Sequence, residues 1–234
     1  MRGVLAAIES PRVFWFKLMN RQMVAFSICR NLYQFAQTEE AGRIQEIVDI
    51  GANKGQFAKI ARFCWPRAFI DSYEPDALAG AAFVREHGAD RRIRLHQFAL
   101  GEKAGILTIH CGSTSEQNSA LIEIQTDSSR TFEVRVERLD DVANEGRGGV
   151  RMVKIDVQGF EMHVLGGAEA FLQATQFVLV EVSLMDMFVG GAKPEEIWSW
   201  LRQHGFDYRA VLDCYYDPTT GTMLQMDVLF RKRK

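Results

Sequence analysis

The chain has 234 residues, a formal net charge of −2, 47% hydrophobic residues and 25% charged residues. This length suits one globular domain with a sizeable core, and the composition excludes a disordered or fibrous protein. A charge this close to neutral disfavours nucleic acid as a partner, because phosphate binding usually shows as a strongly basic surface.

The four cysteines, Cys29, Cys64, Cys111 and Cys214, are far apart and form no CxxC pair. This pattern speaks against a zinc knuckle or a redox dithiol and indicates reduced thiols. No apolar run approaches the about 20 residues that a membrane-spanning helix needs, and the N-terminus lacks the pattern of a signal peptide. We therefore expect a soluble cytoplasmic protein with no transmembrane segment.

Residues 12–36 combine aromatic and aliphatic side chains with four basic residues, and they contain no acid, glycine or proline. This composition predicts a helical segment. We assign residues 1–44 to an N-terminal helical extension that packs on the main domain or on a second subunit, which would make the protein a homodimer. The alternatives are a lid over the substrate and a contact with a membrane surface.

From residue 45 onward, short apolar runs alternate with helix-like segments, which is the pattern of βαβ units and a parallel sheet. Period-two alternation around a polar loop at 111–119 predicts an antiparallel insertion within the same domain. We therefore expect one α/β domain over residues 45–234, which ends in a hairpin. The predicted strands are 46–50, 69–74, 93–100, 105–110, 131–139, 150–156, 176–183, 208–213 and 223–230, and the predicted helices are 56–64, 76–88, 160–173 and 194–204.

The first predicted strand of this domain runs into the turn Gly51-Ala52-Asn53-Lys54-Gly55. In open α/β sheets the turn after the first strand is a usual ligand site, and its glycines let a ligand approach the backbone near a helix N-terminus. A dinucleotide motif would read GxGxxG, but Asn53 occupies the place of the central glycine, which argues against a nicotinamide cofactor.

Two acids narrow the choice of ligand at this turn. Asp49, at the end of the first strand, would repel a diphosphate and attract an ammonium group. Glu74 ends the second strand, at the distance of about 20 residues where an acid binds a ribose diol. A nucleoside that carries a cation and no phosphate satisfies both acids, and S-adenosylmethionine is such a molecule.

Several motifs in a fixed order resemble those of a known family. They are VDIGANKGQF, YEP, FALGEKAG, ERLDDV, VKIDVQGFEMHVLGGA and LVEVS. Over residues 45–231 the chain resembles the FkbM family of S-adenosylmethionine-dependent methyltransferases, within the larger class I methyltransferase fold. The resemblance implies a Rossmann-like α/β fold, a three-layer sandwich around a seven-stranded sheet that is mostly parallel and has a reversed C-terminal strand. It also implies O-methylation of a hydroxyl on a sugar, a glycan or a secondary metabolite, so that the partner is a small-molecule or carbohydrate acceptor.

Carried over by position, the resemblance also implies a set of cofactor-binding residues. These are Asp49, Gly51, Asn53 and Gln56 near the methionine end of S-adenosylmethionine, Glu74 on its ribose, and Phe98 and Ala99 against its adenine.

The reacting groups are expected at the ends of the fourth and fifth parallel strands, which adjoin the first. Asp156 ends one of these strands, and Glu181 lies deep in the other, where an acid needs a partner. We interpret Asp156 as the residue that binds or deprotonates the acceptor, with Glu181 supporting it. Glu161, at the start of the next helix, is a third catalytic candidate or else a charge that suits the helix dipole. His163 is more simply a packed or solvated helix residue.

No metal is expected, but an alternative remains. Asp156, Glu181 and Asp186 are hard oxygen ligands of the kind that Mg²⁺ accepts, and such an ion would lower the pKa of an acceptor hydroxyl. Asn118 and Ser119, in the polar loop, would complete the acceptor pocket. Two other functions stay open: a catalytically silent methyltransferase-like binding domain, and a nicotinamide-dependent oxidoreductase.

Overall fold

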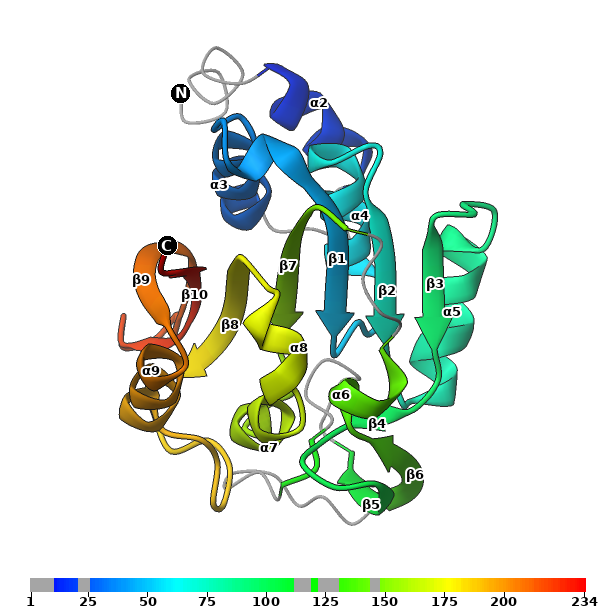
Figure 1. Cartoon of the computed structure of the whole chain (residues 1–234), viewed down its shortest axis with the longest axis vertical. Coiled ribbons are helices and arrows are strands. Elements are labelled where there is room, and N and C mark those ends of the chain that lie inside the picture. The colour runs from blue at the N-terminus through cyan, green and yellow to red at the C-terminus, as the bar shows by residue number, and fades with distance from the viewer. Residues whose placement is uncertain (1–10, 21–25, 112–118, 122–130, 144–147) are drawn as a thin grey trace.

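The computed structural model describes residues 11–20, 26–111, 119–121, 131–143 and 148–234 (Figure 1). Its centre is a seven-stranded sheet in the order β3-β2-β1-β7-β8-β10-β9, in which β10 runs antiparallel to both of its neighbours. The predicted fold class is confirmed, including the reversed last strand. The strands are β1 (Ile44–Ile50), β2 (Phe69–Tyr73), β3 (Ile93–His96), β7 (Val150–Ile155), β8 (Phe177–Ser183), β9 (Phe206–Tyr216) and β10 (Met223–Lys232).

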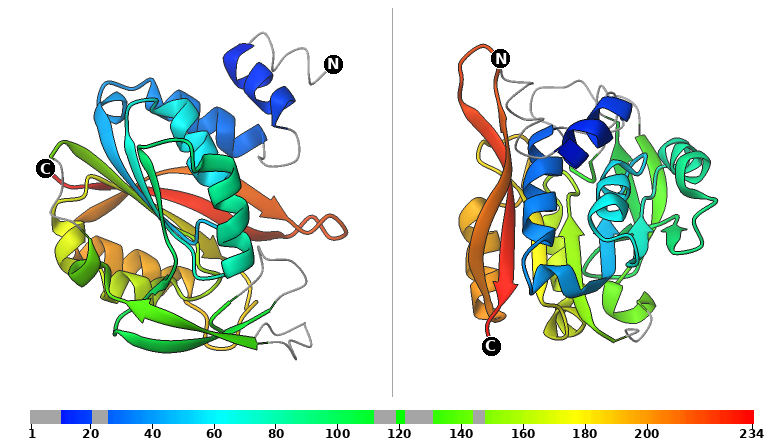
Figure 2. Two further views of the ribbon diagram at one scale, coloured as in Figure 1. Left: turned by 90° about the vertical axis from the view of Figure 1, so that its right-hand side faces the viewer. Right: turned by 90° about the horizontal axis from the view of Figure 1, so that it is seen from above.

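Helices cover both faces of this sheet and complete the three layers. One core unites the sheet with α2 (Pro11–Met19), α3 (Phe26–Ala36), α4 (Gln56–Cys64) and α5 (Ala77–His87). The other unites it with α6 (Leu139–Val142), α7 (Glu161–Gly166), α8 (Glu169–Gln173) and α9 (Pro194–Gln203). A short 3₁₀ helix, η1 (Ala41–Arg43), leads into β1. At the edge of the sheet β9 and β10 form a long hairpin, whose tip projects from the body of the molecule (Figure 2).

The predicted antiparallel insertion is present as a second sheet in the order β4-β6-β5. Its strands are β4 (Ala99–Leu100), β5 (Gly105–His110) and β6 (Thr131–Glu137). The prediction of one strand over residues 93–100 was wrong. β3 ends at His96, which pairs with Tyr73 of the large sheet, whereas Ala99 and Leu100 pair with β6. The chain therefore passes from one sheet to the other at residues 97 and 98.

The predicted helix over residues 160–173 is two short helices, α7 and α8. They are separated at Gly167, where an added side chain would overlap the carbonyl oxygen of Gly101. The Gly167 carbonyl in turn accepts a hydrogen bond of 3.0 Å from the backbone N–H of Asp140. Two other chain segments, at Gly101 and Asp140, therefore approach this point closely, and the helix is interrupted there.

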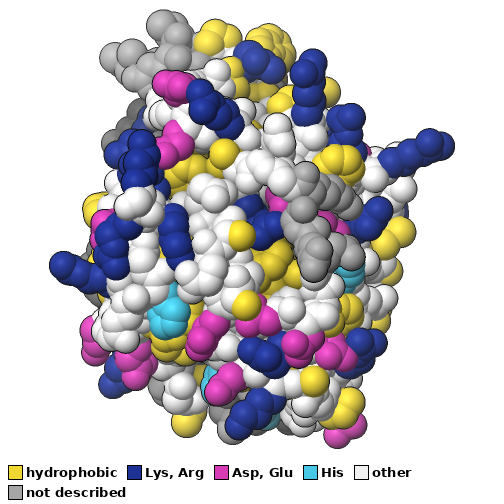
Figure 3. Space-filling model, viewed as in Figure 1, with side chains coloured by type: hydrophobic (Ala, Val, Ile, Leu, Met, Phe, Trp, Pro, Cys, Tyr) yellow, Lys and Arg dark blue, Asp and Glu magenta, His cyan; other side chains and the backbone are white. Residues whose placement is uncertain are grey.

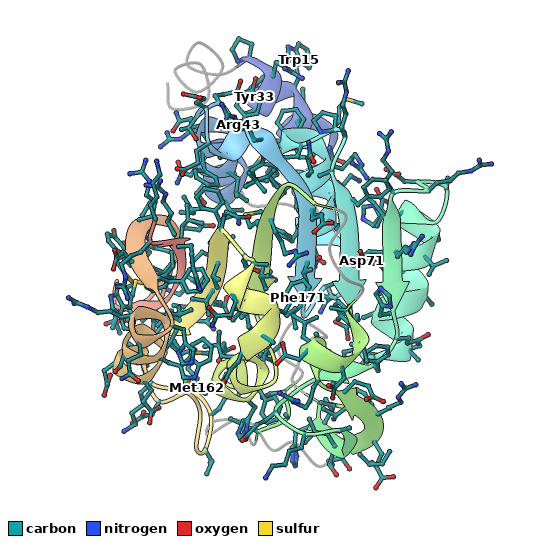
Figure 4. The ribbon with its side chains drawn as sticks, in the orientation of Figure 1. Trp15, Tyr33, Arg43, Asp71, Met162 and Phe171 are labelled. Atoms are coloured by element: carbon teal, nitrogen blue, oxygen red, sulfur yellow. The ribbon has the colours of Figure 1, made fainter. Side chains whose placement is uncertain are left out.

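The N-terminal helices lie against the main domain. On α3, Cys29 and Leu32 are fully buried, and the amide nitrogen of Asn31 donates a 2.6 Å hydrogen bond to the carbonyl oxygen of Leu212 in β9. The outer side of α2 is apolar and exposed, with Trp15 61% and Met19 82% accessible. Figure 4 shows Trp15 at the top of the molecule, where Figure 3 shows hydrophobic side chains at the surface. Within the described residues, no helix is long and apolar enough to cross a membrane.

Candidate active site

A cavity of about 780 Å³ opens where the parallel strands β1, β2, β7 and β8 end. It extends from the second sheet, across the turn after β1, to the β9–β10 hairpin. Most of the predicted site residues line it, namely Gly51, Asn53, Gln56, Glu74, Phe98, Ala99, Asp156 and Glu181. The described lining does not include Asp49 or Glu161.

The glycines of the turn are required by the protein itself. Gly51 has φ 78°, and an added Cβ would overlap the carbonyl oxygen of Asp156. Gly55 has φ 89°, and an added Cβ would overlap the ring of His87, which also hydrogen-bonds the Gly55 carbonyl at 2.9 Å. The space beside these glycines is filled by the end of β7 and by α5, while Gly51 also lines the cavity, and the approach of a ligand to their backbone stays a prediction.

Glu74 joins the turn to the end of β2. Its Oε2 accepts a 2.7 Å hydrogen bond from the backbone N–H of Asn53, and its Oε1 accepts one of 2.8 Å from that of Asp76. Burial raises the pKa of Glu74 to about 7, against the lowering effect of these two N–H groups. Each carboxylate oxygen can accept a second hydrogen bond, so the carboxylate keeps acceptor capacity on the cavity wall.

Asp49 lies behind the cavity wall and is fully buried. Its Oδ2 accepts a 3.3 Å hydrogen bond from the Ser72 hydroxyl, while its Oδ1 has no hydrogen-bond partner among the described residues and lies 3.9 Å from the ammonium nitrogen of Lys154. Burial raises the pKa of Asp49 to about 6, although Lys154 acts against the rise. In this arrangement Asp49 contacts the cavity through Lys154.

Asp156 is the best-positioned ionised group on the wall. Its Oδ2 lies 2.9 Å from the Lys154 ammonium nitrogen, and its Oδ1 accepts a 2.9 Å hydrogen bond from the side-chain amide of Gln158. Burial alone would raise the pKa of Asp156, but Lys154, Gln158 and Glu181 together bring it below its usual value. Gln158 holds a left-handed conformation, φ 54°, which is uncommon for a residue other than glycine.

Glu181 lies beside Asp156, and the same amide joins the two acids. Its Oε2 accepts hydrogen bonds from the amides of Gln158 at 2.7 Å and Gln225 at 2.9 Å. Burial, and then the charges of Asp156 and Asp227, raise the pKa of Glu181 well above its usual value. Of the two acids, Asp156 therefore ionises more readily than Glu181.

Glu161 is buried beside the Asp156–Gln158–Glu181 group and is not part of the described cavity lining. Its Oε1 accepts hydrogen bonds from the backbone N–H groups of Val157 at 3.2 Å and Gly159 at 3.1 Å. Burial raises its pKa to about 7. The side chain thus holds the loop that carries Gln158. Glu161 also lies in the first turn of α7, as the predicted helix-dipole role requires, and its catalytic role stays a prediction.

Of the other predicted residues, only Ser119 contacts the group around Asp156 and Glu181 within the described part of the chain. Asp186 lines a separate, smaller cavity, and no cluster of three potential metal ligands among His, Cys, Asp and Glu occurs in the described part of the chain. His163 stacks on Phe160 with ring centres 4.2 Å apart. Asn118 lies outside the described residues, whereas the Ser119 hydroxyl donates a 2.6 Å hydrogen bond to the carbonyl oxygen of Gln158.

A family model decides where this chain belongs. The model described as the methyltransferase FkbM domain matches residues 49–208. The chain belongs to the FkbM methyltransferase family. The resemblance that the motifs predicted is therefore confirmed.

Individual members of the FkbM family and one solved structure can be compared with this chain. The 2-O-methyltransferase NoeI of Sinorhizobium fredii is 29% identical over 159 residues, which cover 62% of this chain and 65% of NoeI, just under two thirds of its length. The 31-O-demethyl-FK506 methyltransferase FkbM of Streptomyces tacrolimicus is 28% identical over 199 residues, 71% of this chain and 74% of that protein. The magnesium protoporphyrin IX methyltransferase ChlM from Synechocystis PCC 6803, solved with bound SAM, has a TM-score of 0.52 and 7% identity over 88% of this chain and 77% of its own. The last likeness shows the fold alone.

Several polar residues of this FkbM-family site were missed in the sequence, among them Lys154, Gln158, Gln225 and Asp227. Lys154 and Asp227 each stand in a mostly apolar stretch of strand, VRMVKI and MLQMDVLF. A charge in such a strand needs a partner, which was the signal that we applied to Glu181 and could have applied to both. Gln158 gave no such signal, because its role depends on a left-handed backbone that the sequence does not indicate.

Proposed function

We propose that this protein is an S-adenosylmethionine-dependent methyltransferase that acts on a hydroxyl oxygen of a small-molecule or carbohydrate acceptor. The observation that carries this proposal is the ionised carboxylate of Asp156, paired with Lys154, in the same cavity as the turn after β1 and Glu74. The printed activities of two relatives, a 2-O-methyltransferase and a 31-O-demethyl-FK506 methyltransferase, support oxygen as the methylated atom.

The residues present fit the cofactor. Glu74 has acceptor capacity for a ribose diol, and Phe98 and Ala99 offer an apolar wall near it for adenine. S-adenosylmethionine carries a positive sulfonium charge. In the described part of the cavity lining, the carboxyl groups outnumber the one ammonium group, that of Lys154. When bound, S-adenosylmethionine supplies a methyl group that is activated because it is bonded to a positively charged sulfonium sulfur.

The role of the chain is to align the acceptor hydroxyl with the methyl group of the cofactor and to accept the hydroxyl proton. Asp156 is ionised, lines the cavity and can accept that proton at a carboxylate oxygen. Lys154 and Gln158 fix the position of this carboxylate from two sides. Orientation of the two reactants supplies much of the rate enhancement in such a displacement.

A methyl-transfer screen tests the proposal. Sugars, glycan fragments and hydroxylated secondary metabolites are incubated with labelled S-adenosylmethionine, with and without EDTA, and the product is analysed for O-methyl groups. We expect transfer to at least one acceptor in both conditions, and loss of at least about 100-fold in Asp156→Ala, because general base catalysis contributes 10²–10⁴-fold. Transfer that persists in Asp156→Ala would refute the assigned base, and loss with EDTA alone would establish a metal.

Calorimetry separates the two remaining alternatives. Titration with S-adenosylmethionine and with NAD distinguishes a methyltransferase site from a nicotinamide site. Binding of S-adenosylmethionine with no transfer to any acceptor would favour a catalytically silent domain. Binding of NAD in its place would favour an oxidoreductase.

A further inference from the structure

The antiparallel half of the sheet adds a row of carboxyl groups to the cavity. Asp227 of β10 pairs directly with Glu181 of β8 on one side and with Asp213 of β9 on the other, and all three residues line the cavity. Directly opposite residues of an antiparallel pair are close, and like charges there destabilise the sheet. The fold therefore maintains an unfavourable arrangement at this point.

Within this row Asp227 is the member without a polar partner. Glu181 accepts hydrogen bonds from two glutamine amides, and Asp213 accepts one of 2.9 Å from the N–H of Cys214. For the carboxylate of Asp227, no hydrogen bond or salt bridge to the described residues exists. Lys154 acts on Asp227 through its charge, and its hydrogen bonds go to Asp156 and to the Gly51 carbonyl oxygen.

The strand order places Asp227 on the opposite side of Asp156 from the cofactor residues. Asn53, Glu74 and Ala99 follow β1, β2 and β3, whereas Asp227 lies beyond β7 and β8 in the order β3-β2-β1-β7-β8-β10-β9. A cofactor on the first group and a proton acceptor at Asp156 leave the part of the cavity near β10 to the acceptor. Ser27 and Ile28 of α3 line the same cavity.

We propose that Asp227 binds the methyl acceptor, by accepting a hydrogen bond from a hydroxyl or ammonium group that neighbours the reacting hydroxyl, and that it excludes acceptors with an anionic group there. This inference rests on the proposed function. Burial, and then the charge of Asp156, raise the pKa of Asp227 to about 7, so a donor group that binds above that pH meets an ionised carboxylate. Hydrogen bonds to a charged group are stronger than those between neutral groups.

Three matched probes test the acceptor class without knowledge of the natural substrate. Methyl glucoside, its 2-amino-2-deoxy counterpart and methyl glucuronide are titrated by ligand-observed NMR at pH 8 onto protein saturated with S-adenosylhomocysteine. We expect the neutral and amino glycosides to bind and the glucuronide not to bind. Asp227→Asn should weaken the binding of the amino glycoside about tenfold and that of the neutral glycoside less. The carboxylate charge that this variant removes strengthens a hydrogen bond from an ammonium group more than one from a hydroxyl.

The outcomes separate this inference from the proposed function. Equal binding of all three probes, or unchanged affinities in Asp227→Asn, would overturn the role of Asp227 and leave the methyltransferase proposal in place. No binding of any probe, with S-adenosylhomocysteine bound, would overturn it too. Failure of S-adenosylhomocysteine itself to bind would instead refute the proposed function, from which the role of Asp227 follows.

Thermal stability gives a second readout that a structural role of Asp227 would not produce. Its pKa in the folded protein is above the value of about 3.9 for an unfolded aspartate, so ionisation destabilises the folded state increasingly from pH 4 to pH 7. Asp227→Asn should raise the melting temperature at pH 8 and change it little at pH 4. The control, Asp207→Asn on β9, removes an exposed carboxylate that is paired with Arg233 and should not raise the melting temperature. A lower melting temperature for Asp227→Asn at pH 8 would show that the carboxylate is needed for packing and would overturn the inference.

Discussion

Lys154 is the residue on which the charges of the site depend. It is buried, with its ammonium nitrogen 2.9 Å from Asp156 and 3.9 Å from Asp49, and those two acids raise its pKa against the effect of burial. Removing one partner of a buried ion pair leaves the other charge uncompensated, at a cost of about 3–5 kcal/mol. Lys154 therefore decides which of the surrounding acids is ionised.

The first prediction concerns Lys154→Met. Without the ammonium group the pKa of Asp156 should rise, because Lys154 is the largest influence that lowers it. The acidic limb of the pH–rate profile for methyl transfer should therefore move to higher pH, and chemical denaturation should show a loss of about 3–5 kcal/mol in the free energy of unfolding. Lys154→Arg, which keeps the charge, should restore most of the profile. An unshifted limb in Lys154→Met would contradict this role.

The second prediction concerns Glu74 and pH. Its pKa of about 7 in the folded protein lies above the usual value, so the carboxylate is ionised above pH 7 and takes up a proton below it. A ribose diol donates better to the ionised form, and the affinity for S-adenosylmethionine should fall by up to about tenfold between pH 7 and pH 6. Calorimetry at pH 6, 7 and 8 measures this change. In Glu74→Gln the affinity should be lower and independent of pH, while Glu102→Gln, on an exposed side chain, should behave as the wild type.

At the residue scale, the sequence predicted which kinds of side chain form the site better than it predicted which atoms those side chains contact. Asp156 and Glu181 were placed at one point because each ends or interrupts an apolar strand, and the two lie together around Gln158. Glu161 lies at a helix start as predicted, but that position does not reveal that its carboxylate also accepts hydrogen bonds from two backbone N–H groups of the preceding loop. Asp49 was assigned to the cofactor, but its contact with the cavity is made through a lysine.

The turn between β1 and α4 is the element that joins the two halves of the site. The N–H groups of Gly51 and Ala52 both donate to the Tyr73 carbonyl oxygen at 3.0 Å. The N–H of Asp156 donates to the carbonyl oxygen of Ile50, just before the turn, at 3.1 Å. The turn is thereby held between β2 and β7. Its shape positions Asp156 as well as any cofactor.

The third prediction follows from this contact. Gly51→Ala places a methyl group where the Asp156 carbonyl lies, at a φ of 78° that alanine disfavours. The variant should lose several kcal/mol of stability, more than the about 1 kcal/mol of a typical substitution, because the backbone of β7 must move. The control is Gly105→Ala, where nothing lies within 4 Å of the added Cβ and φ is not positive. Equal melting temperatures for the two variants would contradict the prediction.

Elements were predicted well where periodicity alone decides them. The strands of the parallel sheet and the helices α4 and α5 were read from apolar runs and their boundaries. Two predicted elements were divided, at residues 97 and 98 and at Gly167, because the chain there changes sheet or meets another backbone. Such contacts are between segments distant in sequence, and a local pattern carries no information about them.

At the scale of the whole molecule, the N-terminal helices share the core of the main domain. Val13, Cys29 and Leu32 are fully buried in one cluster with Ile60 of α4 and Leu212 of β9. Burial of a large aliphatic side chain contributes about 1.5–3 kcal/mol, so these contacts bear on the stability of the entire fold. They also keep α3 at the wall of the cavity.

The fourth prediction tests this dependence with Leu32→Ala. Truncation of a fully buried leucine should cost about 2–5 kcal/mol in the free energy of unfolding and should lower the affinity for acceptors, because α3 also carries Ser27 and Ile28 to the cavity wall. The matched control is Met19→Ala on α2, which is 82% exposed and should change stability by less than about 0.5 kcal/mol. Urea denaturation of both variants, with sedimentation to compare their oligomeric state, distinguishes the two faces of the N-terminal segment. If Met19→Ala dissociated a dimer and Leu32→Ala were neutral, the segment would stabilise an assembly, and its packing on the main domain would not be what maintains the fold.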